Sequence, residues 1–65
     1  MAPPLKKGAK ILVVEGVQQG SQGIVTMVRR IFDEEDQKTR WVVWADALDG
    51  GDRIKTRLSW VRELQ

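Results

Sequence analysis

Glycines divide this chain into short runs of β-branched residues, and this division constrains the fold more than any other feature. The run over residues 11–14 is stopped by Gly16, and the run over residues 24–28 follows Gly23. Further strands are expected over residues 39–45 and 53–57, with a 3₁₀ turn at Leu58–Trp60 that leads into a short closing strand. Short strands joined by tight turns favour closure over an open sheet. We therefore predict an all-β small barrel of about five antiparallel strands.

The barrel must be stabilised by apolar burial alone. A domain of 65 residues is commonly held together by disulfides or a structural metal, but this sequence contains neither cysteine nor histidine. The expected free energy of unfolding is about 3–10 kcal/mol, from roughly 0.05–0.15 kcal/mol per residue. Residues 1–8, with two prolines, are predicted to form a flexible N-terminal arm, and residues 9–65 a single barrel domain.

One turn predicts the pairing of two strands. Gly50 and Gly51 can both adopt positive φ, as a two-residue type I′ hairpin loop requires. In the resulting register Ala45 faces Thr56 and Trp44 faces Arg57. Apolar and charged side chains are then sorted onto opposite faces of the hairpin.

The composition argues against catalysis. Without histidine or cysteine there is no thiol nucleophile, no imidazole relay and no zinc site, and the serines have no activating base. The acidic run over residues 33–36 lacks the spacing of a calcium loop, so we interpret it as a solvated hairpin tip. We predict a protein that is not an enzyme, with no cofactor, no metal and no small-molecule substrate.

No segment predicts a membrane span. The longest apolar run covers residues 11–14, far below the roughly 20 residues that a bilayer-crossing helix needs. A cytoplasmic location is therefore expected.

The spacing of glycines and valines resembles the KOW motif, which is found in NusG-type transcription elongation factors and several large-subunit ribosomal proteins. The resemblance covers 21 of the 65 residues and rests on Gly8, Gly16, Gly20, Gly23, Val25 and Val28. It implies an SH3-like barrel whose partner is RNA, a ribonucleoprotein or the transcription machinery. KOW segments commonly carry a basic residue where this chain has Gln19, so phosphate contact through this loop is weakened. Glutamine can still hydrogen-bond a base edge or a phosphate.

Two valines of the motif predict an irregularity. Val25 and Val28 are three residues apart, so a flat strand would direct them to opposite faces. A bend or bulge between them would bring both side chains into the core, as closure of a small barrel demands.

A basic stripe is the strongest candidate for a binding surface. Arg53, Lys55 and Arg57 alternate and would project from one strand face, next to an outward Trp44. Phosphates favour such a row of charges, and tryptophan offers a stacking plane for an unpaired base. In the alternative interpretation this is an ordinary solvated face. Asp46 then neutralises Lys55, and Arg57 lies over Trp44 as a cation–π pair.

Other residues extend the candidate site. Trp41 is expected in the core and Trp60 at the barrel end, which leaves Trp44 as the exposed aromatic. Only one of the adjacent Arg29 and Arg30 can join a given patch. The predicted binding residues are Arg53, Lys55, Arg57, Trp44, Arg30 and Gln19.

Two functions fit this surface. The first is a small binding module that contacts RNA or a ribonucleoprotein or transcription complex through the basic face. The second is a protein-docking SH3-like subunit of a larger complex that binds no nucleic acid. An exposed tryptophan is compatible with both.

Overall fold

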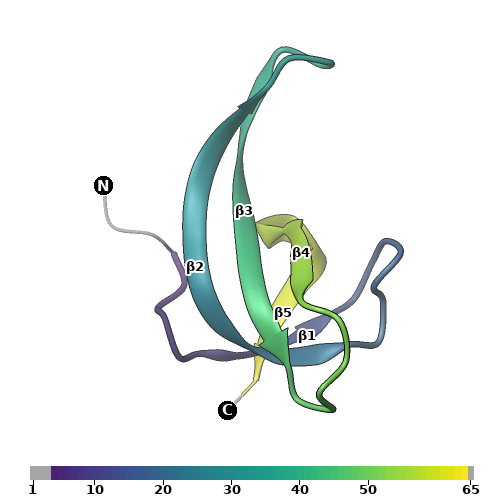
Figure 1. The fold of residues 1–65 in the computed structure, drawn as a ribbon. Helices are drawn as coiled ribbons and strands as arrows, with labels where there is room; N and C mark the ends of the chain where they lie inside the picture. The colour runs from purple at the N-terminus through teal and green to yellow at the C-terminus, as the bar shows by residue number, and fades with distance from the viewer. Residues whose placement is uncertain (1–3, 65) are drawn as a thin grey trace.

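Five antiparallel strands form one strongly bent sheet in the order β4-β3-β2-β1-β5 (Figure 1). The structure is a computed structural model that describes residues 4–64. Its elements are β1 (Lys10–Val13), β2 (Gln22–Asp33), β3 (Lys38–Ala47), β4 (Ile54–Arg57), the 3₁₀ turn η1 (Leu58–Trp60) and β5 (Val61–Leu64). The predicted all-β fold is confirmed, with five strands and the 3₁₀ turn at the expected residues. Within the described part of the chain, no helix is long and apolar enough to cross a membrane.

Alternating residues of the strands build the core. Ile11 and Val13 of β1 lie opposite Val43 and Ala45 of β3 across the barrel interior, because successive side chains of a strand point to opposite faces. The buried apolar residues are Leu5, Ile11, Val13, Val25, Val43, Ala45 and Ile54.

The N-terminal segment differs from the predicted flexible arm. Residues 1–3 lie outside the described part of the chain, but Leu5 is only 7% exposed and belongs to the core. The N–H of Gly8 donates to the carbonyl of Val25 at 2.8 Å. Proline excludes a regular strand here, yet an irregular segment can still bury one leucine and use free backbone groups of β2.

The predicted bulge in β2 is confirmed. The register between β2 and β3 shifts between Val25 and Met27, so that Val25 pairs with Ala45 and Val28 with Val43. Val25 is buried and Val28 packs against the core, which places both valines on the inner side. The bulge thus bends β2 into the barrel wall.

The predicted register between β3 and β4 is wrong by two residues. Ala45 pairs with Ile54, and Trp44 pairs with Lys55 instead of Arg57. A type I′ turn needs positive φ at both central residues, but of the two glycines only Gly50 has it, at 77°. The loop is therefore longer than two residues. Because the error is an even number, the sorting of side chains between the faces is unchanged.

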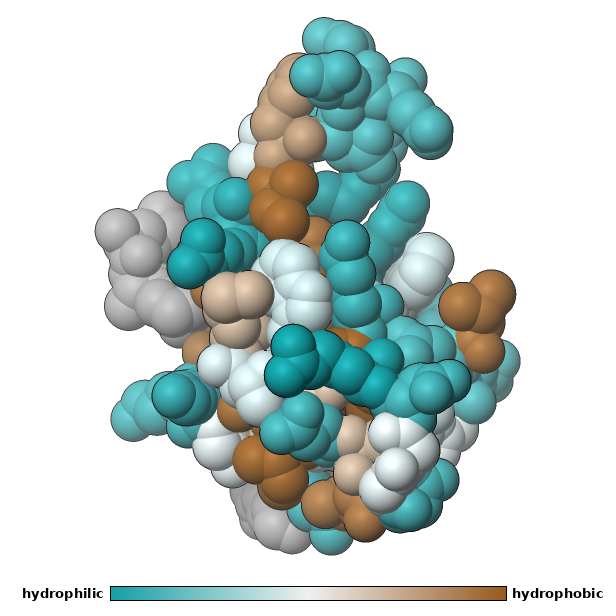
Figure 2. All heavy atoms as spheres, in the orientation of Figure 1, coloured by the Kyte–Doolittle hydropathy of each residue, from teal (hydrophilic) through white to brown (hydrophobic). Residues whose placement is uncertain are grey.

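The β2–β3 hairpin extends beyond the barrel. Strand β1 pairs with β2 only over residues 22–24, and β4 pairs with β3 only over residues 42–45. Residues 29–41 therefore form a protruding hairpin arm, which Figure 1 shows rising past β4. The acidic run lies at its tip, as predicted, with residues 34–37 in the turn. Figure 2 shows hydrophilic atoms at this tip and apolar atoms directly beneath it.

Candidate nucleic-acid interface

Lys55 and Trp44 form the centre of the candidate surface. They are direct partners in the β3–β4 register, and both side chains point away from the core, whose residues alternate with them. The Lys55 ammonium lies 5.7 Å from the centroid of the Trp44 ring. This distance is within cation–π range, so the aromatic ring holds an exposed cation in place.

Arg57 is held by a different tryptophan from the one expected. Its guanidinium carbon lies 4.5 Å from the centroid of the Trp60 ring. In the observed register Arg57 pairs with Val42 and not, as predicted, with Trp44, and η1 places Trp60 beside it. Trp60 in turn rests against Gly16, where a Cβ atom would lie 2.8 Å from the ring carbon Cζ3. Arg57 therefore stacks on a ring that is itself fixed.

Arg53 contributes less free charge than Lys55 and Arg57. It precedes β4, and its Nε lies 3.7 Å from Oδ1 of Asp46. The alternative interpretation paired Asp46 with Lys55, but the partner of Asp46 is Arg53. Both side chains are 67% exposed, and an ion pair so open to solvent is weak.

Arg30 lies on the other face of the hairpin. It pairs with Trp41, and its guanidinium carbon lies 5.9 Å from that ring. Met27 is the partner of Trp44, and Arg30 lies three positions further along β2, so Met27 and Arg30 point to opposite sides. Arg29 shares the outward face with Trp44. The spacing of Val25 and Val28, which predicts the bulge, also indicates that Arg29 and not Arg30 lies on the outward face.

Trp41 is half-buried and does not belong to the core. It lies on the inner face of β3, as expected, but beyond the last residue that β4 covers, which is Val42. The barrel interior ends near Val43, and Trp41 continues its inner face onto the hairpin arm.

Gln18, and not Gln19, links the β1–β2 loop to the basic strand. The Gln18 Nε2 donates to the carbonyl of Arg53 at 3.2 Å, and the Lys55 N–H donates to the Gln18 Oε1 at 3.1 Å. One amide side chain thus takes the place of a neighbouring strand on the free edge of β4. Gln19 is exposed beside it in the same loop, and its N–H donates to the carbonyl of Gly16 at 3.1 Å.

Replacing Gln18 by alanine is expected to release the edge of β4. The free energy of unfolding should fall by about 1 kcal/mol, the usual net contribution of such hydrogen bonds, and the Lys55 amide should exchange faster. Hydrogen exchange followed by NMR measures both effects. Gln19→Ala is the matched control, because within residues 4–64 its side chain forms no hydrogen bond, and it should leave the Lys55 amide unchanged. Equal exchange in the two variants would contradict the assignment.

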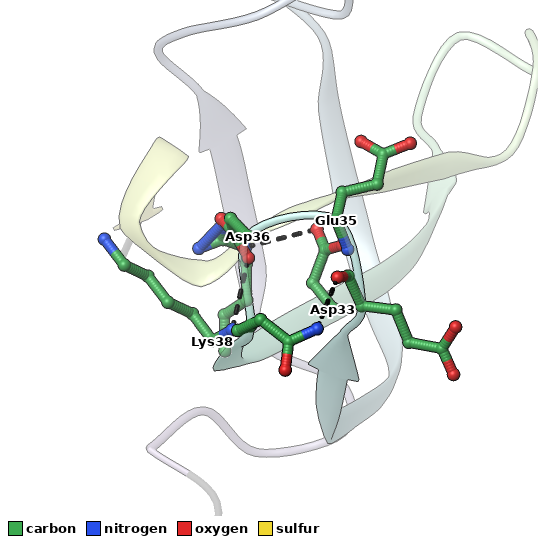
Figure 3. A network of polar contacts seen from close by, with 7 residues as sticks. Asp33, Glu35, Asp36 and Lys38 are labelled. Carbon is green, nitrogen blue, oxygen red and sulfur yellow. Dashed lines mark hydrogen bonds and ion pairs between the residues drawn. The ribbon is translucent and has the colours of Figure 1, made fainter.

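The acidic tip neutralises one more cation, Arg40. Arg40 forms an ion pair with Asp36, and its Nε lies 3.8 Å from Oδ2 of Asp33. The same aspartates also shape the turn, since Asp33 accepts from the N–H of Glu35 at 3.0 Å and Asp36 from that of Lys38 at 3.2 Å (Figure 3). The tip is therefore a turn stabilised by its own aspartates, although the Arg40 Nε is buried there without a hydrogen-bond partner in residues 4–64. Among the described residues, no group of acidic side chains is arranged to hold a metal ion.

The remaining cations of the outward face are free. Across residues 4–64, neither Lys55, Arg57 nor Arg29 lies within ion-pair distance of a carboxylate. The face that β2, β3 and β4 share thus presents three free cations around a half-buried tryptophan. This arrangement suits an anionic ligand with aromatic groups.

Two of the glycines that carry the KOW resemblance have a backbone conformation that favours glycine, and a third lies at a crowded position. Gly16 and Gly20 adopt positive φ, at 88° and 93°, and a Cβ atom at Gly23 would lie 2.7 Å from the carbonyl oxygen of Asp46 in β3. Comparisons of the chain with protein-family models, curated proteins and solved structures found no match, so the KOW resemblance stays a prediction.

Proposed function

We propose that this chain is a non-enzymatic cytoplasmic binding module that contacts RNA, within a ribonucleoprotein or transcription complex, through the outward face of β3 and β4. One observation carries the proposal. Lys55 and Arg57 are free of ion pairs in the described residues, and each lies over a tryptophan ring. Cations held in this way need little ordering when they meet phosphates, so less conformational entropy is lost on binding.

Arg29 supports the same assignment from the neighbouring strand. It extends the row of cations across β2, beside Met27 and Trp44. Bases of a single strand can stack on such apolar and aromatic side chains while the phosphates follow the cations. The weakly basic total of +2 does not oppose this, because four carboxylates are gathered in the hairpin tip and none of them forms an ion pair with Lys55.

Salt dependence tests the proposal. The protein should bind a labelled single-stranded RNA at low salt, and the affinity should fall as salt rises because phosphate contacts release counterions. The double variant Lys55→Gln with Arg57→Gln should bind more weakly. Its slope of log affinity against log salt should be smaller by about 0.7 for each phosphate that the variant no longer binds.

The control variant carries Lys10→Gln and Arg62→Gln, which remove the same charge from the exposed side of β1 and β5. It should keep the slope of the unmodified protein. Absence of binding at about 50 μM protein in low salt, or equal slopes in the two double variants, would refute RNA contact through this face.

Protein docking is the second candidate, and the hairpin arm favours it. Ile31 and Phe32 are 38% and 53% exposed, on a segment that protrudes from the barrel. Exposed apolar residues on a projecting element are typical of protein interfaces. In this case a single protein partner should be recovered after nuclease treatment. Its affinity should depend on Trp44 or Phe32 more than on salt.

A further inference from the structure

A groove of about 470 Å³ lies between the hairpin arm and the basic strand. Ile31 and Val42 line it from β2 and β3, and Lys55, Arg57 and Trp60 line it from β4 and η1. The volume is within the range of about 300–1,000 Å³ that is usual for small-ligand sites. The side formed by the hairpin arm is apolar at Ile31 and Val42 but also carries Arg40, which is paired with Asp36. The other side carries the cations Lys55 and Arg57 beside the Trp60 ring.

Arg57 supplies a flat surface in this groove. The Trp60 ring, 4.5 Å from the guanidinium carbon, covers one face of the guanidinium, and Gly16 supports the ring from behind. Arg57 lines the groove, and no carboxylate of residues 4–64 lies within ion-pair distance of it. A guanidinium plane is a stacking partner for unpaired bases, and its N–H groups donate to phosphate.

The charges at the two ends of the groove orient a ligand. Asp33 and Glu34 line the end next to the hairpin tip, and Lys55 lies on the β4 side. A phosphate is repelled from the first end and attracted to the second. The apolar surface between them includes Ile31, which is 38% exposed.

We propose that this groove receives one unstacked base of a single-stranded RNA. The base lies on the guanidinium plane of Arg57 and against Ile31, and its neighbouring phosphate contacts Lys55. A nucleotide is the ligand that combines a flat, weakly polar face with an adjacent anion, which matches the two sides of the groove. The inference rests on the proposed RNA binding and adds that a base, as well as the phosphates, is bound.

Two probes separate the base from the backbone. The first is an oligouridine of about ten nucleotides, and the second is an oligonucleotide of the same length made of abasic ribose phosphates, which keeps the charges and removes the bases. The unmodified protein should bind the oligouridine at least about fivefold more tightly, since stacking of one base contributes that much or more. The salt slopes for the two probes should be equal.

Arg57→Lys tests the residue assignment, because lysine keeps the charge but lacks the plane. The variant should lose about fivefold or more in affinity for the oligouridine while its affinity for the abasic probe stays unchanged. Arg62→Lys is the matched control: it makes the same substitution on an exposed position of β5, and Arg62 does not line the groove. It should bind both probes like the unmodified protein, and thermal melting verifies that each variant is folded.

The outcomes distinguish the two proposals. Equal affinity of the unmodified protein for the two probes, or an Arg57→Lys variant that binds oligouridine normally, would overturn the base site and leave phosphate contact standing. Binding of neither probe would overturn both. A protein that recognises only a protein partner would give this last result.

Discussion

Replacing Ile54 by alanine is expected to lower the free energy of unfolding by about 2–5 kcal/mol, the usual range for removing a large buried aliphatic side chain. Ile54 is 1% exposed and pairs with Ala45 at the centre of the barrel. Seven buried apolar residues make up the described core, so few neighbours can move to fill the space. Against a total stability of about 3–10 kcal/mol, this loss is a large fraction, so the alanine variant should unfold at a much lower urea concentration than the unmodified protein.

Urea denaturation followed by tryptophan fluorescence measures the effect. Ile54→Val is the control, because it removes a single methylene group and should cost about 0.5–1.5 kcal/mol. If the alanine variant lost no more stability than the valine variant, Ile54 would not be a central core residue.

Replacing Gly23 by alanine is expected to destabilise the fold by about 3 kcal/mol, the upper part of the usual range for overpacking. A Cβ atom here would lie 2.7 Å from the backbone carbonyl oxygen of Asp46 and 2.8 Å from Cδ1 of Ile54. A backbone oxygen inside a paired strand cannot move without opening the β2–β3 ladder. The position therefore needs glycine for space, although its φ is not positive.

The matched control is Gly50→Asn. Gly50 has φ of 77° and no atom within 4 Å of a Cβ position, and asparagine tolerates this backbone conformation. The control should change the free energy of unfolding by less than about 1 kcal/mol, since surface substitutions of this kind have small effects. Equal destabilisation of the two variants in urea denaturation would show that close packing at Gly23 is not the cause.

The faces of the strands were predictable from the sequence because they depend on local periodicity. Val25 and Val28 can both be buried only if β2 contains an irregularity, and the bulge lies between them. The alternation of Val43 and Ala45 with Trp44 likewise identified the inner and outer sides of β3. These predictions use a spacing of a few residues and need no knowledge of distant contacts.

The features that were not predictable depend on one side chain or on long-range contacts. The loop after β3 depends on Asp49, whose carboxylate accepts a hydrogen bond from the Gly51 N–H at 2.8 Å. This bond favours a longer turn than the two glycines alone indicate. Gln18 finds its partners 35 and 37 residues away along the chain. Nothing in the local pattern separates it from Gln19. Leu5 is buried because it packs against the core residues of the strands, although its own segment lacks any strand pattern.

The contact of the β1–β2 loop with β4 affects how the protein behaves at high concentration. An uncovered edge strand can accept a strand from another molecule, and such growth leads to aggregation; β4, with four residues, is short, which limits this pairing. Here the amide of Gln18 occupies two of its backbone groups, and the outward row of Arg53, Lys55 and Arg57 adds charge repulsion between like rims. We therefore expect the cations that are proposed to bind the ligand to oppose growth of the sheet as well.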